Sequence, residues 1–521
     1  MSAPQYDVAI VGYGPVGAVL AALLGQAGLR VHVCDKLAGV YDIPRAISMD
    51  HEILRVFQQL GVLAQIEPHM EPFTNSEYFG VDGQLIRRMT MIAPPYPQGH
   101  TPSVVFSQPP LEQALRARIA QMPQVTVALQ AEMQAMAQDG EGVRLQLHQA
   151  EGALQTVHAR WVVACDGGAS SLRGLAGIAL EDLDFDEPWL VVDVLLNAQG
   201  LRKLPPVSVQ YCEPQRPCTL VIGPKNHRRW EISLKPGEDP AEAATPEGTW
   251  RLLSRWITPE DGQLWRQASY RFHALVADRW RQGRVFVAGD AAHMQPPFLG
   301  QGMCQGIRDA ANLAWKLIAV ATGEVRGDAA ERLLDSYGQE RKAHVRTLTQ
   351  RIKDIGAVIC ERDEARARAR DARLLAECGG VVKDTPRQDV LPKLDQGCLS
   401  AQDHAARGTL FPQPRLHHAG QTVWMDDRHG HGWRWVSDGQ LPPIQAPQAW
   451  TVLAGPRDWQ ETEGVLAAWF ARHGCHAALV RPDNYVFGVA ATADAQTALQ
   501  QEWLQWLHES PAFITTTGDK P

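Results

Sequence analysis

The chain of 521 residues lacks the features that mark several classes of protein. Its nine cysteines are dispersed and include no C-x-x-C pair, which argues against a disulfide framework, structural zinc and a dithiol redox centre. No uninterrupted apolar run approaches the roughly 20 residues needed to cross a bilayer. The first residues, MSAPQYDVAIVG, have no basic segment of the kind that opens a signal peptide. We therefore expect a soluble cytoplasmic protein without a membrane partner.

An excess of positive charge is also missing. The formal net charge is -8, so nucleic acid is not an expected partner, because phosphate binding needs a basic surface. Residues Asp426, Asp427, His429 and His431 lie close together, but in a polar loop without the spacing of a metal site, and no metal is expected. Hydrophobic residues at 45% and charged residues at 21% are typical of globular proteins. The length predicts two or three domains.

The N-terminal segment has the order of a dinucleotide-binding unit. An apolar run over residues 6–11 predicts a strand buried on both faces, and it meets Gly12, Gly14 and Gly17 in G-x-G-x-x-G spacing. An apolar helix and a second strand ending in Asp35 follow. The first glycine allows a turn, the second a close approach of pyrophosphate, and the third helix packing, while the acidic residue suits a ribose hydroxyl. The motif alone does not separate FAD from NAD.

Two more acidic turns follow strands of the core type. Residues 161–165 predict a buried strand that ends at Asp166, and residues 284–288 predict another that ends at Gly289 and Asp290. A proline pair and the glycine-rich run 300–302 then lead into a long helix. A carboxylate at the end of a strand suits a sugar hydroxyl, and free N–H groups at a helix start suit an anion or a ring edge.

The remaining segments interrupt a regular βαβ pattern. Residues 78–89 predict a hairpin, residues 106–119 a helix and residues 125–147 a β-meander. Alternating strands between residues 189 and 273 predict an antiparallel sheet inserted into the dinucleotide fold.

The C-terminal part begins with a charged run at residues 361–373, which predicts a solvent-exposed helix. Residues 379–397 predict a linker. A small third α/β domain follows, including a strand at residues 451–454, and Trp433 and Trp435 are expected in its core or interface.

Three motifs together carry a family resemblance: GYGPVG, CDGGASSLR and GDAAHMQPPFLGQGM. They resemble the single-component FAD-dependent aromatic hydroxylases, the p-hydroxybenzoate hydroxylase class. Within that class, the runs YDIPRAISMD, FSQPPLE and WVVACDGGAS look most like the hydroxylases of 3-(3-hydroxyphenyl)propionate. The resemblance covers residues 1 to about 390, and RPDNYVFGV is similar to the thioredoxin-like appendage of many of these enzymes.

The resemblance implies an α/β fold of three domains. A Rossmann-like FAD-binding domain of the glutathione-reductase type would comprise residues 1–75, 100–185 and 276–390. An inserted antiparallel β-sheet substrate domain would comprise residues 76–99 and 186–275. A thioredoxin-like domain without C-x-x-C, residues 391–521, would serve packing or oligomerisation, for example in a homodimer.

The resemblance also implies roles for individual residues. FAD contacts would come from Gly12, Gly14, Gly17, Asp35, Lys36, Arg45, Gln108, Asp166, Gly289, Asp290 and Met303. The flavin ring would lie beside Pro297, Gly300, Gln301 and Gly302. Tyr211, Arg216 and His273 are the candidates on the substrate side, with Arg216 as a carboxylate partner, although each also fits a structural role. Cys304 stands where relatives usually have Asn, which puts an amide contact to the flavin in question.

The implied activity is hydroxylation of a phenolic substrate, such as 3-(3-hydroxyphenyl)propionate or 3-hydroxycinnamate. NADH or NADPH would reduce FAD, and dioxygen would then form a flavin hydroperoxide at C4a. One alternative is another FAD oxidoreductase, a reductase or a halogenase; for a halogenase we expect W-x-W-x-I-P, and only WRWVSD at residues 433–438 is similar. A second alternative is a non-catalytic FAD-binding protein, which would not require the loops beside the flavin ring.

Overall fold

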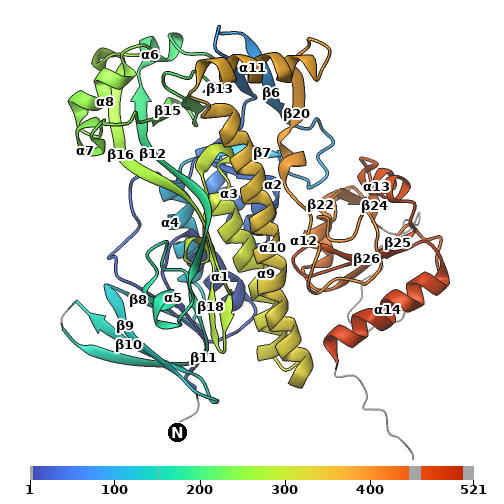
Figure 1. Ribbon diagram of the computed structural model, residues 1–521. Helices are drawn as coiled ribbons and strands as arrows, with labels where there is room; N and C mark the ends of the chain where they lie inside the picture. Colours follow the sequence, from blue (N-terminus) through green and yellow to red (C-terminus); the bar gives the residue numbers. More distant parts are fainter. Residues whose placement is uncertain (1–3, 151, 445–458, 509–521) are drawn as a thin grey trace, which may run out of the picture.

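The computed structural model describes residues 4–150, 152–444 and 459–508. These residues form a parallel-sheet unit, a second large sheet above it, and a C-terminal domain that lies beside the long central helices (Figure 1). The strand predicted at residues 451–454 lies outside the described residues. Over the part of the chain that is described, no helix combines the length and the apolar character needed to cross a bilayer.

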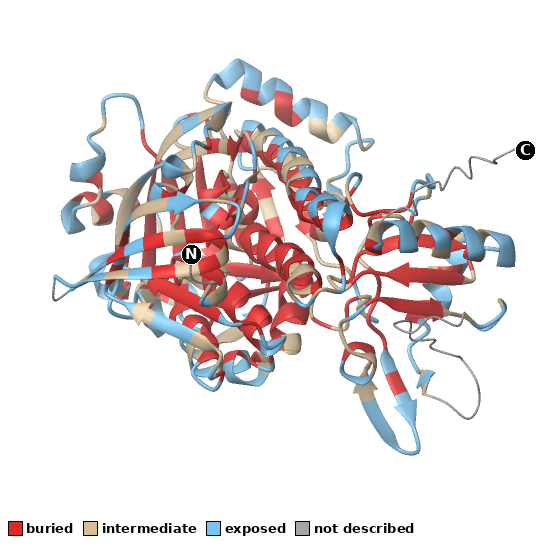
Figure 2. Ribbon diagram, turned by 90° about the horizontal axis from the view of Figure 1, so that it is seen from below, coloured by how far each residue is buried: buried red, intermediate tan, exposed pale blue. Residues whose placement is uncertain are grey.

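A parallel sheet forms the core of the first unit. Its strands stand in the order β18 (Val285–Val287), β11 (Leu154–Ala164), β1 (Tyr6–Val11), β2 (Val31–Asp35) and β8 (Val125–Leu129). The helices α1 (Pro15–Gln26), α4 (Gln108–Ile119) and α9 (Gly302–Ala321) belong to the same hydrophobic core. Burial on both faces explains why β1 is a continuous apolar run. In Figure 2 the buried segments gather in this sheet and the helices on it.

Residues 125–147 form the predicted β-meander only from residue 131 onward, because the strand before it pairs elsewhere. β8 runs parallel to β2 at the sheet edge, whereas β9 (Ala131–Gln138) and β10 (Val143–Gln149) form a hairpin that continues antiparallel onto β11. An edge strand with one exposed face alternates in sequence in the same way as a meander strand. The alternation therefore could not identify the partner strand.

The second sheet confirms the inserted antiparallel sheet and includes the early hairpin. Two long strands, β12 (Leu180–Leu196) and β16 (Gly262–Ala277), rise from the first unit into it. The hairpin of β5 (Ser76–Phe79) and β6 (Leu85–Thr90) joins through a parallel pairing with β13 (Ser208–Tyr211). The other members are β14 (Cys218–Ile222), β15 (His227–Ser233), β19 (His293–Met294) and β20 (Lys383–Pro386). The predicted domain boundaries stay a prediction, since β12 and β16 each run through one of them.

For the segment after the central helices, the predicted linker is wrong, whereas the predicted charged helix with an exposed face is confirmed but incomplete. The expected linker contains β20, which pairs with β6 and closes the edge of the second sheet. The charged helix α11 (Glu364–Ala376) is not only solvated, because Arg370 and Asp371 are buried. Asp371 accepts hydrogen bonds from the backbone N–H of Val81 at 2.8 Å and from Gln84 at 3.1 Å. Composition shows that a helix is charged, but not which of its charges reach a neighbouring hairpin.

The C-terminal domain packs against α9 and α10 (Gly327–Ile359) through aromatic side chains. Trp433 contacts Trp315 of α9, with ring centroids 5.7 Å apart, which confirms its expected place at a domain interface. Asp426 is buried between Arg55 and Arg434, each at a hydrogen-bonding distance, so its carboxylate holds two arginines. The elements of this domain are β21 (Arg415–His418), β22 (Gln421–Trp424), α12 (Met425–His429), β23 (Arg434–Ser437), β24 (Gln460–Glu461), α13 (Val465–His473), β25 (Ala477–Val480), β26 (Val486–Ala490) and α14 (Ala493–Leu507).

Short elements complete the connections between these units. They are β3 (Ser48–Asp50), α2 (His51–Leu60), α3 (Leu63–Ile66), β4 (Met70–Pro72), β7 (Ser103–Phe106), α5 (Ser171–Leu175), α6 (Ala198–Arg202), α7 (Pro240–Ala243), α8 (Pro246–Leu253) and β17 (Arg281–Gln282). β3, β4 and β7 form a small sheet of their own. The helix predicted from residue 106 begins at Gln108, because Phe106 ends β7.

Candidate functional site

The turn between β1 and α1 has the geometry that its three glycines predict. Gly12 has a φ of +104°, and a Cβ there would lie 2.2 Å from the carbonyl oxygen of Cys165. A Cβ on Gly17 would lie 2.0 Å from the carbonyl oxygen of Gly12. A Cβ on Gly14, by contrast, would meet no atom within 4 Å. The first and third glycines are therefore required by the fold, and the second leaves backbone open to a ligand.

A groove of about 250 Å³ extends from this turn across the end of β2. It is lined by the predicted residues Gly12, Gly14, Asp35, Lys36, Arg45 and Asp166. Asp35 accepts hydrogen bonds from the backbone N–H groups of Tyr13 at 2.6 Å and Leu37 at 2.8 Å, which fix its carboxylate at the carboxyl end of β2. Each carboxylate oxygen keeps a lone pair that a ribose hydroxyl can use.

A second cavity of about 400 Å³ continues the groove toward the inserted sheet. The two share Gly14, Arg45, Cys165 and Gly167 in their walls, so together they form one cleft. The predicted residues that line the second cavity are Gly14, Arg45, Gln108, His273, Asp290, Pro297, Gly300, Gly302 and Met303. Segments far apart in the sequence therefore meet along one elongated space.

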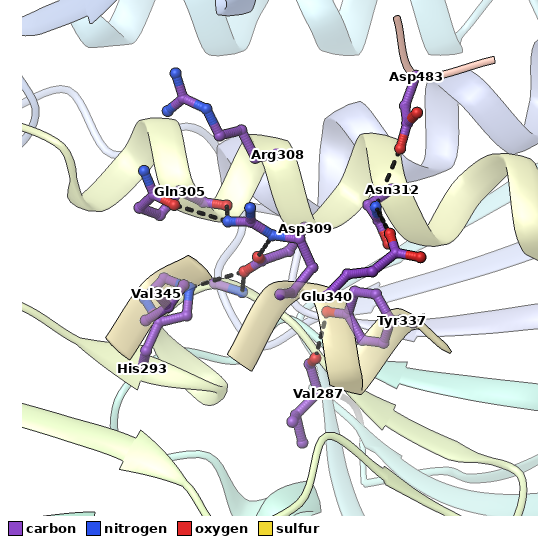
Figure 3. A network of polar contacts seen from close by, with 12 residues as sticks. Val287, His293, Gln305, Arg308, Asp309, Asn312, Tyr337, Glu340, Val345 and Asp483 are labelled. Carbon is purple, nitrogen blue, oxygen red and sulfur yellow. Dashed lines mark hydrogen bonds and ion pairs between the residues drawn. The ribbon is translucent and has the colours of Figure 1, made fainter. Parts of the chain in front are cut away.

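Asp290 follows β18 and lines the cleft. The turn that carries it is held by Asp309 of α9, which Figure 3 shows between the helix and His293. The backbone N–H of Gly289 donates to Asp309 at 3.0 Å, and Asp309 also accepts from Arg341 at 2.8 Å and lies 2.8 Å from His293. Burial opposes the ionisation of Asp309, but His293 and Arg341 lower its pKa overall. For Asp290, burial raises the pKa, and the nearby positive charges of His293 and Arg45 offset part of that effect.

At Gly300 and Gly302, the loop before α9 presents backbone to the cleft. Gly300 has a φ of +58°, and a Cβ there would lie 2.3 Å from the Oγ of Ser48. A Cβ on Gly302, the first residue of α9, would meet nothing within 4 Å. The buried side chain of Gln301 turns away and hydrogen-bonds Asp50 at 3.2 Å and Arg308 at 3.1 Å. This loop can therefore approach a flat ring edge with free N–H groups.

Cys304 does not line either part of the cleft. Its thiol is fully buried and lies 3.8 Å from the carbonyl oxygen of Ser48 in β3, to which it donates. Burial raises the pKa of this thiol to about 12. Cys304 therefore makes a packing contact with β3 rather than a contact within the cleft.

The segment that carries Arg45 is held by the inserted sheet. Arg229 donates to the carbonyl oxygen of Arg45 at 2.7 Å, and Arg266 donates to that of Pro44 at 2.6 Å. On the other side, Gln108 accepts a hydrogen bond from the backbone N–H of Ala46 at 2.6 Å. Arg45 itself is exposed and lies where the two cavities meet.

Of the three predicted substrate-side residues, only His273 lines the cleft. Arg216 forms an ion pair with Glu238 at 2.6 Å, outside the cleft, so the expected contact with a substrate carboxylate is not supported. Tyr211 packs against Trp256, with ring centroids 5.4 Å apart, also outside the cleft.

Four residues of the inserted sheet that sequence reasoning missed line the cleft instead: Arg229, Glu231, Arg271 and Phe272. The run HRRWEIS of β15 contained a usable signal, because Trp230 and Ile232 face the apolar core while Arg229 and Glu231 alternate with them. Charged residues that are buried at alternate positions of a core strand indicate a polar site on its other face.

Comparisons with known proteins agree with this geometry. The family model described as FAD binding domain matches residues 5–352, and the one described as HcaD C-terminal domain matches residues 445–503. A probable NADH-specific resorcinol 4-hydroxylase of Rhodococcus jostii is 37% identical over 516 residues, which cover 95% of this chain and 94% of the relative. A 3-(3-hydroxy-phenyl)propionate/3-hydroxycinnamic acid hydroxylase of Klebsiella pneumoniae is 33% identical over 532 residues, with coverage of 95% and 94%.

Solved structures share the whole fold. The flavin-dependent monooxygenase PieE, in complex with FAD and substrate, superposes with a TM-score of 0.79 at 19% identity, covering 97% of this chain and 100% of that one. Aklavinone-11 hydroxylase with FAD and aklavinone gives a TM-score of 0.78 at 23% identity, with the same coverage of 97% and 100%.

Proposed function

Because the chain belongs to the FAD binding domain family, we propose that it is a monooxygenase that hydroxylates a phenolic aromatic substrate with FAD, NADH and dioxygen. One observation carries this proposal. A single cleft runs from the glycine turn at residues 12–17, past Asp290, to the loop at residues 297–302, and ends against β15 and β16 of the inserted sheet. That order of residues suits a dinucleotide cofactor followed by a small aromatic molecule.

The residues along the cleft fit FAD in particular. The open backbone at Gly14 suits the pyrophosphate, Asp35 suits the adenosine ribose, and Asp290 suits the ribityl hydroxyls. The free N–H groups near Gly302 suit the flavin ring edge. When bound, FAD supplies the electron transfer from NADH and the activation of dioxygen, for which no amino-acid side chain is suited.

The protein orients the substrate and limits its contact with water. Phe272, Pro297 and Met294 supply apolar surface to the same cavity that the polar residues Arg229 and Glu231 line. Arg271 and His273 lie there too, but Asp186 already pairs with Arg271 at 2.9 Å and lies 3.7 Å from His273. A substrate carboxylate would have to compete with Asp186, which favours a neutral phenol such as resorcinol over an aromatic acid.

The test is an anaerobic titration of the purified enzyme with NADH, in the presence of resorcinol, 3-(3-hydroxyphenyl)propionate or 3-hydroxycinnamate. We expect a phenol to speed the bleaching of the flavin absorbance and, in air, to gain one oxygen atom by mass spectrometry. The proposal fails if no phenol does either. The variant Asp290→Ala is expected to lose FAD while keeping its circular dichroism spectrum.

The halogenase alternative is disfavoured by the position of its nearest motif. Trp433 and Trp435 belong to the hydrophobic cluster between α9, α10 and the C-terminal domain, and neither lines the cleft. The proposal also includes a cytoplasmic location, with which nine free cysteines are consistent. It includes a homodimer, which sedimentation velocity of the purified chain would test.

A further inference from the structure

Glu231 is a buried carboxyl group without a protein partner. Its side chain lies on β15, is only 6% exposed and lines the substrate end of the cleft. Over the described residues, it forms no side-chain hydrogen bond and no ion pair with another residue. The nine other buried carboxyl groups each have such a contact: Asp50, Glu52, Glu112, Asp193, Asp261, Asp309, Glu340, Asp371 and Asp426.

The neighbouring arginines, Arg229 and Arg266, compensate the charge of Glu231 only in part, because their hydrogen bonds go to other groups. Arg229 of the same strand forms an ion pair with Asp193 of β12 at 2.7 Å and also donates to the carbonyl oxygen of Arg45. Arg266 of β16 donates to Pro44 and to the hydroxyl of Tyr270. The other charged and titratable groups that line the same cavity are Arg45, Cys165, Arg271, His273 and Asp290.

An unpaired buried carboxylate is unfavourable, so such a group is neutral or is paired by a ligand. Burial raises the pKa of Glu231 to about 7, with Arg229 lowering it and Asp193 raising it by charge. The group therefore changes its protonation state near neutral pH. A carboxyl group with that property, at the wall of a ligand cavity, is suited to accept a proton from a weakly acidic hydroxyl.

We propose that Glu231 accepts the hydrogen bond of the substrate's phenolic hydroxyl and takes its proton, which makes the site selective for a neutral phenol. This inference rests on the proposed function and names the recognition group for it. The O–H bond of the phenol breaks, a new O–H bond forms on the carboxylate, and the electron pair stays on the phenolate oxygen. The aromatic ring becomes more electron-rich, as attack on an oxygen electrophile requires.

The first test compares Glu231→Gln with wild type and with the control Glu77→Gln. Gln keeps the size of the side chain but cannot take a proton, and Glu77 lies in the same sheet, in β5, outside the cleft. Resorcinol binding to the FAD-loaded enzymes is measured from the change in flavin absorbance, without turnover, between about pH 6 and about pH 8.5.

In wild type and in Glu77→Gln we expect the affinity for resorcinol to rise with pH through about 7. In Glu231→Gln the affinity should be at least about tenfold weaker at the upper pH and should lack this rise, because the acceptor that ionises is gone. Hydroxylated product per NADH should fall in the same variant, while FAD content stays that of wild type. An unchanged pH profile in Glu231→Gln would overturn the proposal.

A second measurement needs no variant. Wild-type enzyme is titrated with resorcinol and with its dimethyl ether, which has no hydroxyl proton to donate. We expect the ether to bind at least about tenfold more weakly and without the rise near pH 7. Equal binding of the two would overturn the role of Glu231.

The outcomes separate this inference from the proposed function. If wild type binds phenols with the expected pH profile but yields no hydroxylated product, the proposed function fails and the role of Glu231 stands. If wild type hydroxylates phenols and Glu231→Gln does so equally, the inference fails alone. If Glu231→Gln loses FAD without a change in phenol affinity, Glu231 contacts the cofactor and the inference also fails.

Discussion

Replacing Glu231 by Gln is expected to stabilise the folded protein at neutral and alkaline pH. The usual pKa of a glutamate is 4.5, and burial raises that of Glu231 to about 7 in the folded chain. Each pKa unit corresponds to about 1.4 kcal/mol, so the ionised carboxylate destabilises the folded state by about 3 kcal/mol. Gln has a similar shape and no charge, and it avoids this cost.

The sign of the pH dependence follows from the protons bound in each state. Between pH 4.5 and pH 7 the folded protein keeps the proton on Glu231, whereas the unfolded chain loses it. The free energy of unfolding contributed by this group therefore falls as the pH rises through that window. Glu231→Gln lacks the fall, and its stability relative to wild type should increase over the same window.

Urea unfolding of the two FAD-loaded proteins at about pH 5 and about pH 8 measures this difference. Subtracting wild type from variant at each pH cancels the other titrating groups, provided that the urea m-value is the same for both. The variant should gain most of the expected ~3 kcal/mol between the two pH values. A difference that is constant with pH, or that shrinks as the pH rises, would refute the reasoning.

Three further predictions follow from the contacts described. Gly14→Ala should fold but bind FAD more weakly, because a Cβ there meets no protein atom within 4 Å. Gly17→Ala should lower the yield of folded protein, because its Cβ would lie 2.0 Å from the carbonyl oxygen of Gly12. Flavin content and circular dichroism distinguish the two variants, and equal behaviour of both would contradict the assignment. Arg216→Ala should leave resorcinol affinity unchanged, because Arg216 pairs with Glu238 outside the cleft; a weaker affinity in the flavin absorbance titration would return Arg216 to the site. Tyr485→Phe should lower the free energy of unfolding by about 1.5–3 kcal/mol, since it removes a buried hydrogen bond of 2.9 Å from the Tyr485 hydroxyl to Glu52 of α2. The C-terminal domain should then be cleaved faster in limited proteolysis. An unchanged rate of cleavage would show that this hydrogen bond does not hold the domain in place.

The cofactor end of the site could be predicted from the sequence to a large extent. Gly12, Gly14 and Gly17 are constrained by backbone geometry within one turn, and their spacing alone indicates which must be small and which must be open. Asp35 ends a strand of the parallel sheet, and Asp166 and Asp290 follow two others, so their place at one edge follows from the parallel order of the strands. These features are local, because each depends on residues that lie close together in the sequence.

The substrate end depended on the tertiary structure. Arg216 and Arg229 both lie on or near the inserted sheet. Only the fold shows that Arg216 pairs with Glu238 and that Arg229 lines the cleft. In the same way, the alternation of β8 did not identify β2 as its neighbour, and the charged run of α11 did not reveal Asp371 under the hairpin of β5 and β6. Each of these outcomes is set by a partner that is distant in the sequence.

The sequence by itself determined the turns, the buried strands and the position of the cofactor, because these rest on glycine conformation and on hydrophobic periodicity. Only the tertiary structure decided which polar side chains are satisfied by a protein partner and which are left to a ligand. Glu231 shows the reason. The pattern of the strand HRRWEIS indicates that Glu231 is buried. Its lack of a partner depends on distant residues, because Asp193 and the carbonyl groups of residues 44–45 accept the hydrogen bonds of Arg229 and Arg266.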